Sequence, residues 1–203
     1  MSKVAVETKQ CRSCEAVLRI EEFYGPERSY CKECEKSQKK EYNASFRGKA
    51  AQALTDSRKA VRRVERDHGI KVEDTLTLHE VLWTLAETDC TYCGRETPEH
   101  DRQLDHITPI KYSHRNTFDS VCMACSTCNK SKQDIPVITY MLQSCDIYEA
   151  RALIDCISSR SVKTFEEAFK ELAEQAKAYY ETKAIEAIER TRDDGQISAA
   201  RSE

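Results

Sequence analysis

The chain lacks long apolar segments: none approaches the roughly 18 residues needed to span a bilayer, and no N-terminal stretch reads as a signal peptide. Hydrophobic residues make up only 39% of its 203 residues, while 33% are charged. We therefore expect small modules that are stabilised by local cross-links such as metal sites, and no membrane partner. Without a secretion signal, the eleven cysteines indicate a reducing, cytoplasmic compartment, in which they are metal ligands or free thiols.

A net positive charge is also absent. The formal charge is −3, and two four-cysteine zinc centres would take it to about −7. The basic residues are concentrated, however, because residues 36–66 hold ten Lys/Arg against three acidic residues, a local net charge of +7. Such a stripe suits a phosphate backbone, although it also suits a solvated helix face. The candidate nucleic-acid-binding residues of this stripe are Arg58, Lys59, Arg62, Arg63 and Arg66.

A first group of cysteines forms two Cys-x-x-Cys pairs with sixteen residues between them, a spacing typical of a structural zinc site. Its members are Cys11, Cys14, Cys31 and Cys34. A segment of about 35 residues is too small to be stable on its apolar core alone, so zinc would supply much of the folding energy. Phe23 and Tyr24 are expected to pack against this site. Disulfides are the alternative, and the reducing compartment disfavours them.

Helix signals follow this module. A basic helix is expected from about Ser45 to His68, with Gly69 as its C-terminal stop. Its last-turn His68 is expected to interact with the helix dipole and not with a metal. Capping boxes open three further helices, at Thr77-x-x-Glu80, Asp146-x-x-Glu149 and Thr164-x-x-Glu167. The last of these has an apolar stripe that suits either the chain's own core or a homodimer. The stripe consists of Phe165, Phe169, Leu172, Ala176 and Tyr180.

A second group of cysteines lies in the middle of the chain. Its members are Cys90, Cys93, Cys125 and Cys128. Cys122 offers an overlapping Cys-x-x-Cys register with Cys125, but we favour Cys125 and Cys128 as ligands because Asn129 then follows the zinc site directly. Cys122, Cys145 and Cys156 would be buried free thiols.

Between these cysteine pairs lies Leu104-Asp105-His106-Ile107. A zinc held by four thiolates ties the ends of this segment together, so that Asp105, His106 and Asn129 can converge on one further metal. Carboxylate and amide oxygens suit Mg²⁺ or Mn²⁺, and an imidazole suits a general base. Phosphodiester hydrolysis needs an activated water, a cation at the phosphate and a stabilised leaving oxygen. The pattern therefore predicts a nuclease with two structural zincs and one catalytic metal.

These residues resemble the HNH endonuclease family, on Cys90-x-x-Cys93, Leu104-Asp105-His106-Ile107-x-Pro109 and Cys125-x-x-Cys128-Asn129-x-x-Lys132. The resemblance covers about residues 88–135 and implies a β-hairpin and a helix around one metal ion. It implies that Asp105 and Asn129 hold this metal and that His106 activates water. It also implies that Lys132 or Lys130 contacts phosphate. The N-terminal module is similar to the zinc-binding leader of small phage HNH proteins.

One position departs from the family pattern. The family's central asparagine, which shapes the hairpin loop and helps to orient the histidine, would fall at Ser120. Asn116 lies four residues earlier. A serine hydroxyl can still form a hydrogen bond, so we expect the enzyme to be active with Ser120 at this position, and Ser120 and Asn116 are the candidate loop-shaping residues.

The resemblance implies a DNA endonuclease that leaves 5′-phosphate and 3′-hydroxyl ends, phage-encoded or homing, and in the host cytoplasm if phage-encoded. The alternatives are a junction-resolving nuclease, a zinc-stabilised DNA-binding or regulatory protein without catalysis, and a zinc-stapled interaction protein. The expected fold is small α+β, a ββα-metal core with treble-clef-like zinc. The expected domains are a zinc-ribbon-like module (1–37), a basic helical linker (38–87), the nuclease core (88–136) and a helical region (137–203).

Overall fold

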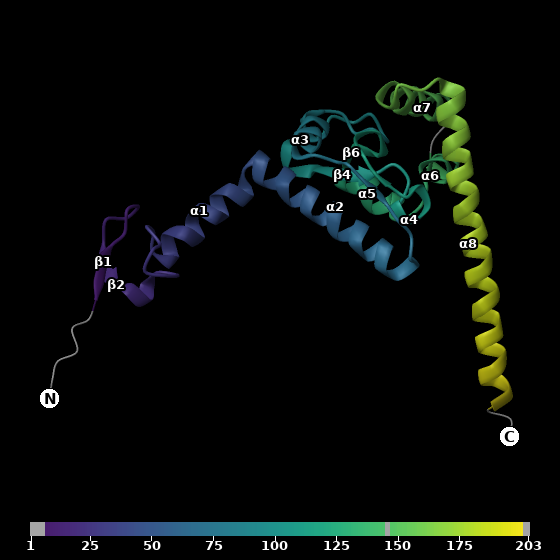
Figure 1. Cartoon of the computed structure of the whole chain (residues 1–203). Helices are drawn as coiled ribbons and strands as arrows, with labels where there is room; N and C mark the ends of the chain where they lie inside the picture. The colour runs from purple at the N-terminus through teal and green to yellow at the C-terminus, as the bar shows by residue number, and fades with distance from the viewer. Residues whose placement is uncertain (1–6, 145–146, 201–203) are drawn as a thin grey trace. The chain divides into compact units, whose positions relative to one another are not determined.

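The computed structural model describes residues 7–144 and 147–200 of the chain, which divides into two compact units, Met1–Gln52 and Ala53–Glu203 (Figure 1). The elements up to the division are β1 (Thr8–Gln10), β2 (Val17–Arg19), the 3-10 helix η1 (Ile20–Glu22), α1 (Lys32–Ala44) and α2 (Phe46–His68), in which the division falls. Then follow β3 (Glu73–Asp74), α3 (Leu78–Ala86), η2 (Glu99–Asp101), β4 (Arg102–His106), α4 (Ile110–Ser113), β5 (Arg115–Asn116), η3 (Phe118–Ser120), β6 (Val121–Cys125), α5 (Ser126–Lys132), α6 (Val137–Ser144), α7 (Ile147–Ser161) and α8 (Phe165–Ala200).

The N-terminal unit is built on a β-hairpin and the start of α1. Strands β1 and β2 pair antiparallel, and Cys31 caps α1 at its N-terminus. Phe23 is buried against Cys11 and Cys31 as predicted. Tyr24, by contrast, is 57% exposed, so the prediction that it packs against the cysteines is wrong. The expected boundary after residue 37 lies inside α1.

The basic helix is confirmed as α2, with both predicted ends. The Ser45 hydroxyl accepts a hydrogen bond from the Gly48 amide at 3.0 Å. Gly48 has a steric reason to be glycine, because a Cβ there would lie 1.8 Å from the backbone oxygen of Tyr42. At the other end Gly69 adopts a left-handed conformation with φ +65°, which glycine adopts without steric cost.

The second unit contains a β-hairpin with a helix at its end. Strands β4 and β6 pair antiparallel, with Asp105 opposite Cys122 and His106 opposite Val121. Helix α5 follows β6 directly and contacts both strands. The short strands β3 and β5 pair in parallel, with Asp74 beside Asn116. This small α+β arrangement agrees with the expected fold class.

The C-terminal helices complete the core of this unit. Figure 1 shows α6, α7 and α8 gathered on one side of the hairpin region, and their buried residues Met141, Ile154 and Leu172 belong to one cluster with Ile107 and Ala124. The predicted capping box at Thr164 is present, since its hydroxyl accepts from the Glu167 amide at 3.2 Å. The predicted cap at Asp146, like Cys145, lies outside the described residues.

The apolar stripe of α8 is divided between core and surface. Leu172 and Ala176 are buried within the chain, whereas Phe169 is 47% and Tyr180 is 54% exposed. Nothing in the described residues supports a homodimer. Nor is any helix among them both long and apolar enough to cross a lipid bilayer.

Candidate active site

Both predicted cysteine groups come together. In each group the four sulfur atoms lie within 4.8 Å of one another, which suits a tetrahedral zinc with Zn–S bonds of about 2.3 Å. Backbone amides also point at the sulfurs, for example that of Cys125 toward Cys90 Sγ at 3.3 Å. Although burial opposes ionisation, the amide of Cys128 and the neighbouring thiols lower the pKa of Cys125 to about 7. These contacts favour the thiolate form that zinc requires.

Cys122 is not part of either group. It is buried, and its thiol donates to the Tyr92 hydroxyl at 3.3 Å. Burial raises its pKa to about 12, which keeps this thiol neutral beside Tyr92. The sulfurs that lie together with those of Cys90 and Cys93 are those of the favoured register, Cys125 and Cys128. The prediction of burial holds for Cys122 but is wrong for Cys156, which is exposed on α7.

Asp105 is held by two donors at the end of β4. The Tyr92 hydroxyl donates to its Oδ2 at 2.5 Å, and the Lys132 ammonium lies 2.9 Å from the same oxygen. Burial raises the pKa of Tyr92 far above its ordinary value, so the hydroxyl remains a donor. Since both contacts use Oδ2, Oδ1 is the oxygen that could ligate a cation.

Lys132 does not occupy the position expected for a phosphate contact. Its side chain is fully buried, and its ammonium donates to the His106 carbonyl at 2.7 Å as well as pairing with Asp105. A lysine buried in this way neutralises a neighbouring carboxylate and cannot reach DNA without breaking both contacts. The exposed Lys130 on α5 is the better placed of the two predicted phosphate ligands.

Asn129 faces the same side of the hairpin as Asp105. Its Nδ2 donates to Gln103 Oε1 at 2.7 Å. Gln103 and Asp105 are two residues apart in β4 and therefore project from the same face of the strand. The amide donor of Asn129 is occupied by Gln103, which leaves its oxygen as the atom that could ligate a cation beside Asp105.

His106 is oriented by Asn116 and not by Ser120. Its Nε2 lies 2.9 Å from Asn116 Oδ1. The Ser120 hydroxyl donates its proton to the Thr117 carbonyl at 2.8 Å, so it has none left for the histidine. Burial lowers the pKa of His106, which favours the neutral imidazole that a general base requires.

Comparison with known proteins bears on this geometry. Residues 90–136 match the family model described as HNH endonuclease. This segment therefore resembles an HNH endonuclease domain, and the unit that contains it, Ala53–Glu203, is called the HNH unit. No curated protein matches the chain significantly. Among solved structures, the chain is similar to the Type II-C Cas9 enzyme from Actinomyces naeslundii, with 24% identity, 71% of this chain covered and a TM-score of 0.33. The chain spans 14% of the length of that enzyme.

Helix α2 contributes one wall of an open pocket at the HNH site. The pocket measures about 330 Å³ and reaches Asp105 and His106. Arg63, Asp67 and His68 line it from α2, and all three are exposed. His68, expected only to interact with the helix dipole, thus also borders the candidate active site.

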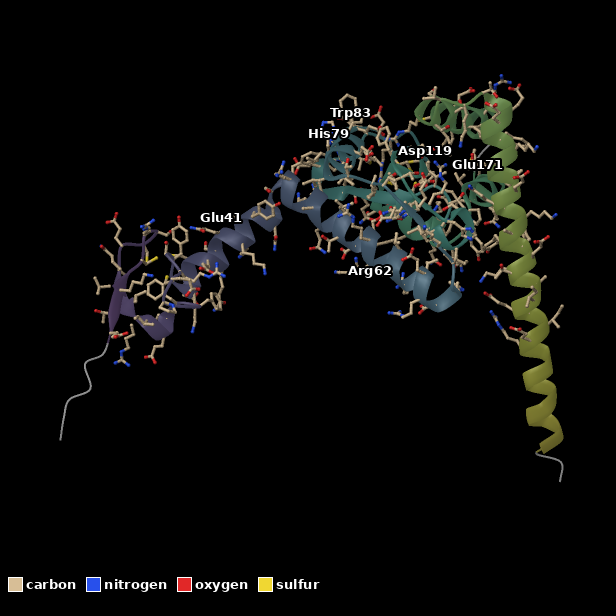
Figure 2. The ribbon with its side chains drawn as sticks, viewed as in Figure 1. Glu41, Arg62, His79, Trp83, Asp119 and Glu171 are labelled. Atoms are coloured by element: carbon tan, nitrogen blue, oxygen red, sulfur yellow. The ribbon has the colours of Figure 1, made fainter. Side chains whose placement is uncertain are left out.

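The other basic residues of α2 are divided between solvent and local acids. Arg62, labelled in Figure 2, is exposed. Lys59 pairs with Asp56 and Arg66 with Asp67, each at 2.8 Å. Arg58 donates to the Leu76 carbonyl at 3.1 Å. Arg62 and Arg63 are therefore the residues most open to a phosphate backbone.

Among the residues that contact the predicted site residues, Tyr92, Gln103, Ser57 and Asp74 were not predicted from the sequence. Tyr92 occupies one of the two unspecified positions of the Cys90-x-x-Cys93 motif, and Gln103 lies on a strand without any distinguishing pattern. Ser57 had a usable signal, because it lies on the same helical face as the apolar Val61 and Val64. A polar residue on an apolar face must find a hydrogen-bond partner inside the protein.

Proposed function

We propose that this protein is a metal-dependent endonuclease that hydrolyses DNA phosphodiester bonds to 5′-phosphate and 3′-hydroxyl ends. The observation that carries the proposal is the arrangement within the HNH segment. Asn129 on α5 contacts Gln103 on the face of β4 from which Asp105 also projects, and His106 borders the same pocket as Asp105. A phage-encoded or homing role would fit the similarity of the N-terminal cysteine module to the zinc-binding leader of small phage HNH proteins.

The chain's own residues have distinct tasks in this reaction. His106 would take the proton from the attacking water, since its neutral form is favoured by burial. Lys132 would hold the Asp105 carboxylate in place through the Nζ–Oδ2 contact of 2.9 Å. Asp105 and Asn129 offer hard oxygen ligands. A Mg²⁺ or Mn²⁺ ion bound there would neutralise the scissile phosphate and stabilise the departing oxygen.

DNA would approach along α2. Arg62 and Arg63 are exposed, and Arg63 borders the pocket that reaches Asp105 and His106. Lys130 on α5 is also exposed and could contact a phosphate. Neutralising several phosphates releases counterions, so DNA affinity should fall steeply as salt rises.

The test is cleavage of supercoiled plasmid by zinc-loaded protein in Mg²⁺ or Mn²⁺. Wild type should nick or linearise the plasmid, and His106→Ala should lose at least about 100-fold of this activity, as expected for a general base. His79→Ala is the matched control, because His79 is exposed on α3 outside the pocket (Figure 2). Brief EDTA treatment should stop cleavage while the structural zincs remain bound. Equal activity in His106→Ala and His79→Ala would contradict the proposal.

A non-catalytic, zinc-stabilised DNA-binding protein is a second candidate, favoured by one observation. Asp105 is only 9% exposed and already pairs with Lys132, which competes with a cation for the carboxylate. This candidate predicts salt-dependent DNA binding without cleavage in any metal. Wild-type protein would be tested for plasmid binding and cleavage in a series of divalent cations. DNA binding without any cleavage would favour the non-catalytic protein over the endonuclease.

A further inference from the structure

Asn116 connects His106 to two residues that lie outside the matched HNH segment. It is fully buried, and its Oδ1 accepts from the Ser57 hydroxyl at 2.6 Å as well as facing His106 Nε2. Its Nδ2 donates to Asp74 Oδ1 at 2.8 Å. Ser57 belongs to α2 and Asp74 to β3, whereas the family match begins at residue 90.

These contacts determine which ring nitrogen of His106 carries the proton. An ionised carboxylate can only accept, so the amide nitrogen of Asn116 must face Asp74 and its oxygen must face His106. Because that oxygen is an acceptor, Nε2 of His106 must be the protonated nitrogen. In the neutral ring, Nδ1 then carries the free electron pair that can accept a proton.

We propose that Ser57 and Asp74 are positioning residues, which orient Asn116 and through it fix His106 in the tautomer with Nδ1 as the base. The inference rests on the proposed nuclease function for its kinetic consequence but not for the tautomer itself. Helix α2 thereby has two roles: its exposed side presents arginines, and its buried Ser57 helps to hold the general base.

The backbone around Asn116 supports this role. Strand β5 pairs with β3 in the register that places Asp74 beside Asn116. The Asn116 carbonyl also accepts from the amides of Thr75 and Leu76, at 3.1 and 3.0 Å. Main chain and side chain of Asn116 are thus both fixed by the segment before the HNH domain, so its amide has little freedom to turn away from His106.

The first experiment reads the tautomer directly, without activity. The nitrogen chemical shifts of the imidazoles are recorded in isotope-labelled full-length zinc-loaded protein, and the His106→Ala spectrum identifies the His106 signals among the five histidines. Wild type should show a single neutral tautomer with Nε2 protonated. Asn116→Ala should show a mixture of both tautomers. A single Nε2-protonated tautomer that persists in folded Asn116→Ala would overturn the inference, whether or not the protein cleaves DNA.

The second experiment measures kinetics in a matched serine pair. Ser57 and Ser158 are 7% and 8% exposed, both lie in helices, and Ser158 Oγ donates only to the local Asp155 carbonyl at 2.8 Å. Ser57→Ala should lower kcat about two- to tenfold with little change in KM, the range for one neutral hydrogen bond. Ser158→Ala should leave kcat unchanged. An equal loss in both variants, or a change confined to KM, would assign Ser57 to packing alone.

A polarity exchange tests Asp74. Asn116→Asp places two carboxylates side by side and should lower kcat by about 100-fold, the upper range for residues that orient a catalytic group. Adding Asp74→Asn restores an amide donor to the pair, and kcat should recover at least about tenfold over the single variant. Because a carboxylate at position 116 also accepts from His106 Nε2, the double variant should keep the single His106 tautomer. Recovery of thermal stability without recovery of kcat would reject Asp74 as a positioning residue.

Discussion

The two four-cysteine groups have the same ligands but very different surroundings. In the described part of the N-terminal unit, the buried cluster around the cysteines is Phe23 with Cys11 and Cys31. In the HNH unit, Cys90, Cys125 and Cys128 belong to a large cluster that extends into α6, α7 and α8. Zinc bound at these two groups would therefore serve two purposes. It would replace a hydrophobic core in the first unit, and in the second it would position Asp105, His106 and Asn129 within an existing core.

The ion pairs of the two units also differ in how exposed their side chains are. In the N-terminal unit, Arg19–Glu21 and Lys36–Glu33 have side chains that are 61–80% exposed. In the HNH unit, Arg115 is 26% exposed and pairs with Glu73, Asp119 and Glu171. Asp119 and Glu171, labelled in Figure 2, both accept from the Arg115 guanidinium, which links η3 to α8. Several charges that form one network contribute more than isolated exposed pairs.

The largest expected effect comes from loss of one zinc ligand in each unit. Cys11 and Cys90 are 0% and 1% exposed, so Cys11→Ser and Cys90→Ser form a matched pair. Cys11→Ser should unfold residues 8–44, because zinc binding supplies about 10–16 kcal/mol in small zinc modules. Cys90→Ser should destabilise the HNH unit, but the amides of its helical core should stay protected from hydrogen exchange. Hydrogen exchange followed by mass spectrometry measures both, and protected amides in the Cys11→Ser hairpin would contradict this division of roles.

A smaller effect is expected from the core of the HNH unit. Leu172 on α8 is 5% exposed and packs into the same cluster as Ile107 and Cys125. Leu172→Ala should lower the free energy of unfolding of this unit by about 2–5 kcal/mol, through lost burial and a residual cavity. Leu142→Ala is the control: Leu142 is 79% exposed, and its loss should change the free energy by no more than about 0.5 kcal/mol.

Urea unfolding monitored separately for the two units measures this effect. The N-terminal unit should unfold at the same urea concentration in both leucine variants. If Leu172→Ala and Leu142→Ala were equally stable, α8 would not contribute to the HNH core, and the C-terminal region would be a separate attachment.

The sequence predicted those features that depend on local pattern. Both cysteine groups, the capping boxes at Thr77 and Thr164 and the glycine stop at Gly69 follow from spacing and residue type, and the structure has them all. Each depends on contacts within a few residues or on a metal whose ligands are recognisable. That is why they could be predicted without the fold.

The predictions that failed depended on tertiary contacts. Lys132 reads as a phosphate ligand, but its burial results from its pairing with Asp105, which lies 27 residues earlier in the chain. Ser120 fitted the family spacing from Asn129, yet the parallel pairing of β3 with β5 brings Asn116 to His106 in its place. A two-residue parallel pairing has no sequence signature, so this substitution could not be foreseen.

The smallest expected effect concerns the ionic link at Arg115. Although burial opposes ionisation, the Thr117 hydroxyl and the charge of Arg115 lower the pKa of Asp119 below its ordinary value of 3.8. A carboxylate whose pKa is lowered by folding stabilises the protein above its unfolded pKa, and this stabilisation is lost as pH falls through the folded pKa. Asp119→Asn should therefore cost about 1 kcal/mol at pH 7. The difference should shrink as wild-type Asp119 becomes protonated in acid.

Urea unfolding of the HNH unit near neutral pH and in acid, with wild type and Asp119→Asn compared under each condition, isolates this carboxylate from the others that titrate in the same range. The exposed Glu21→Gln in the N-terminal unit is the matched control, and it should be nearly neutral at both conditions because its pair with Arg19 lies in solvent. A pH-independent cost of Asp119→Asn would mean that the side chain acts through its shape and neutral hydrogen bonds. The link between α8 and β5, the strand that holds Asn116, would then depend on the Arg115–Glu171 pair and not on the charge of Asp119.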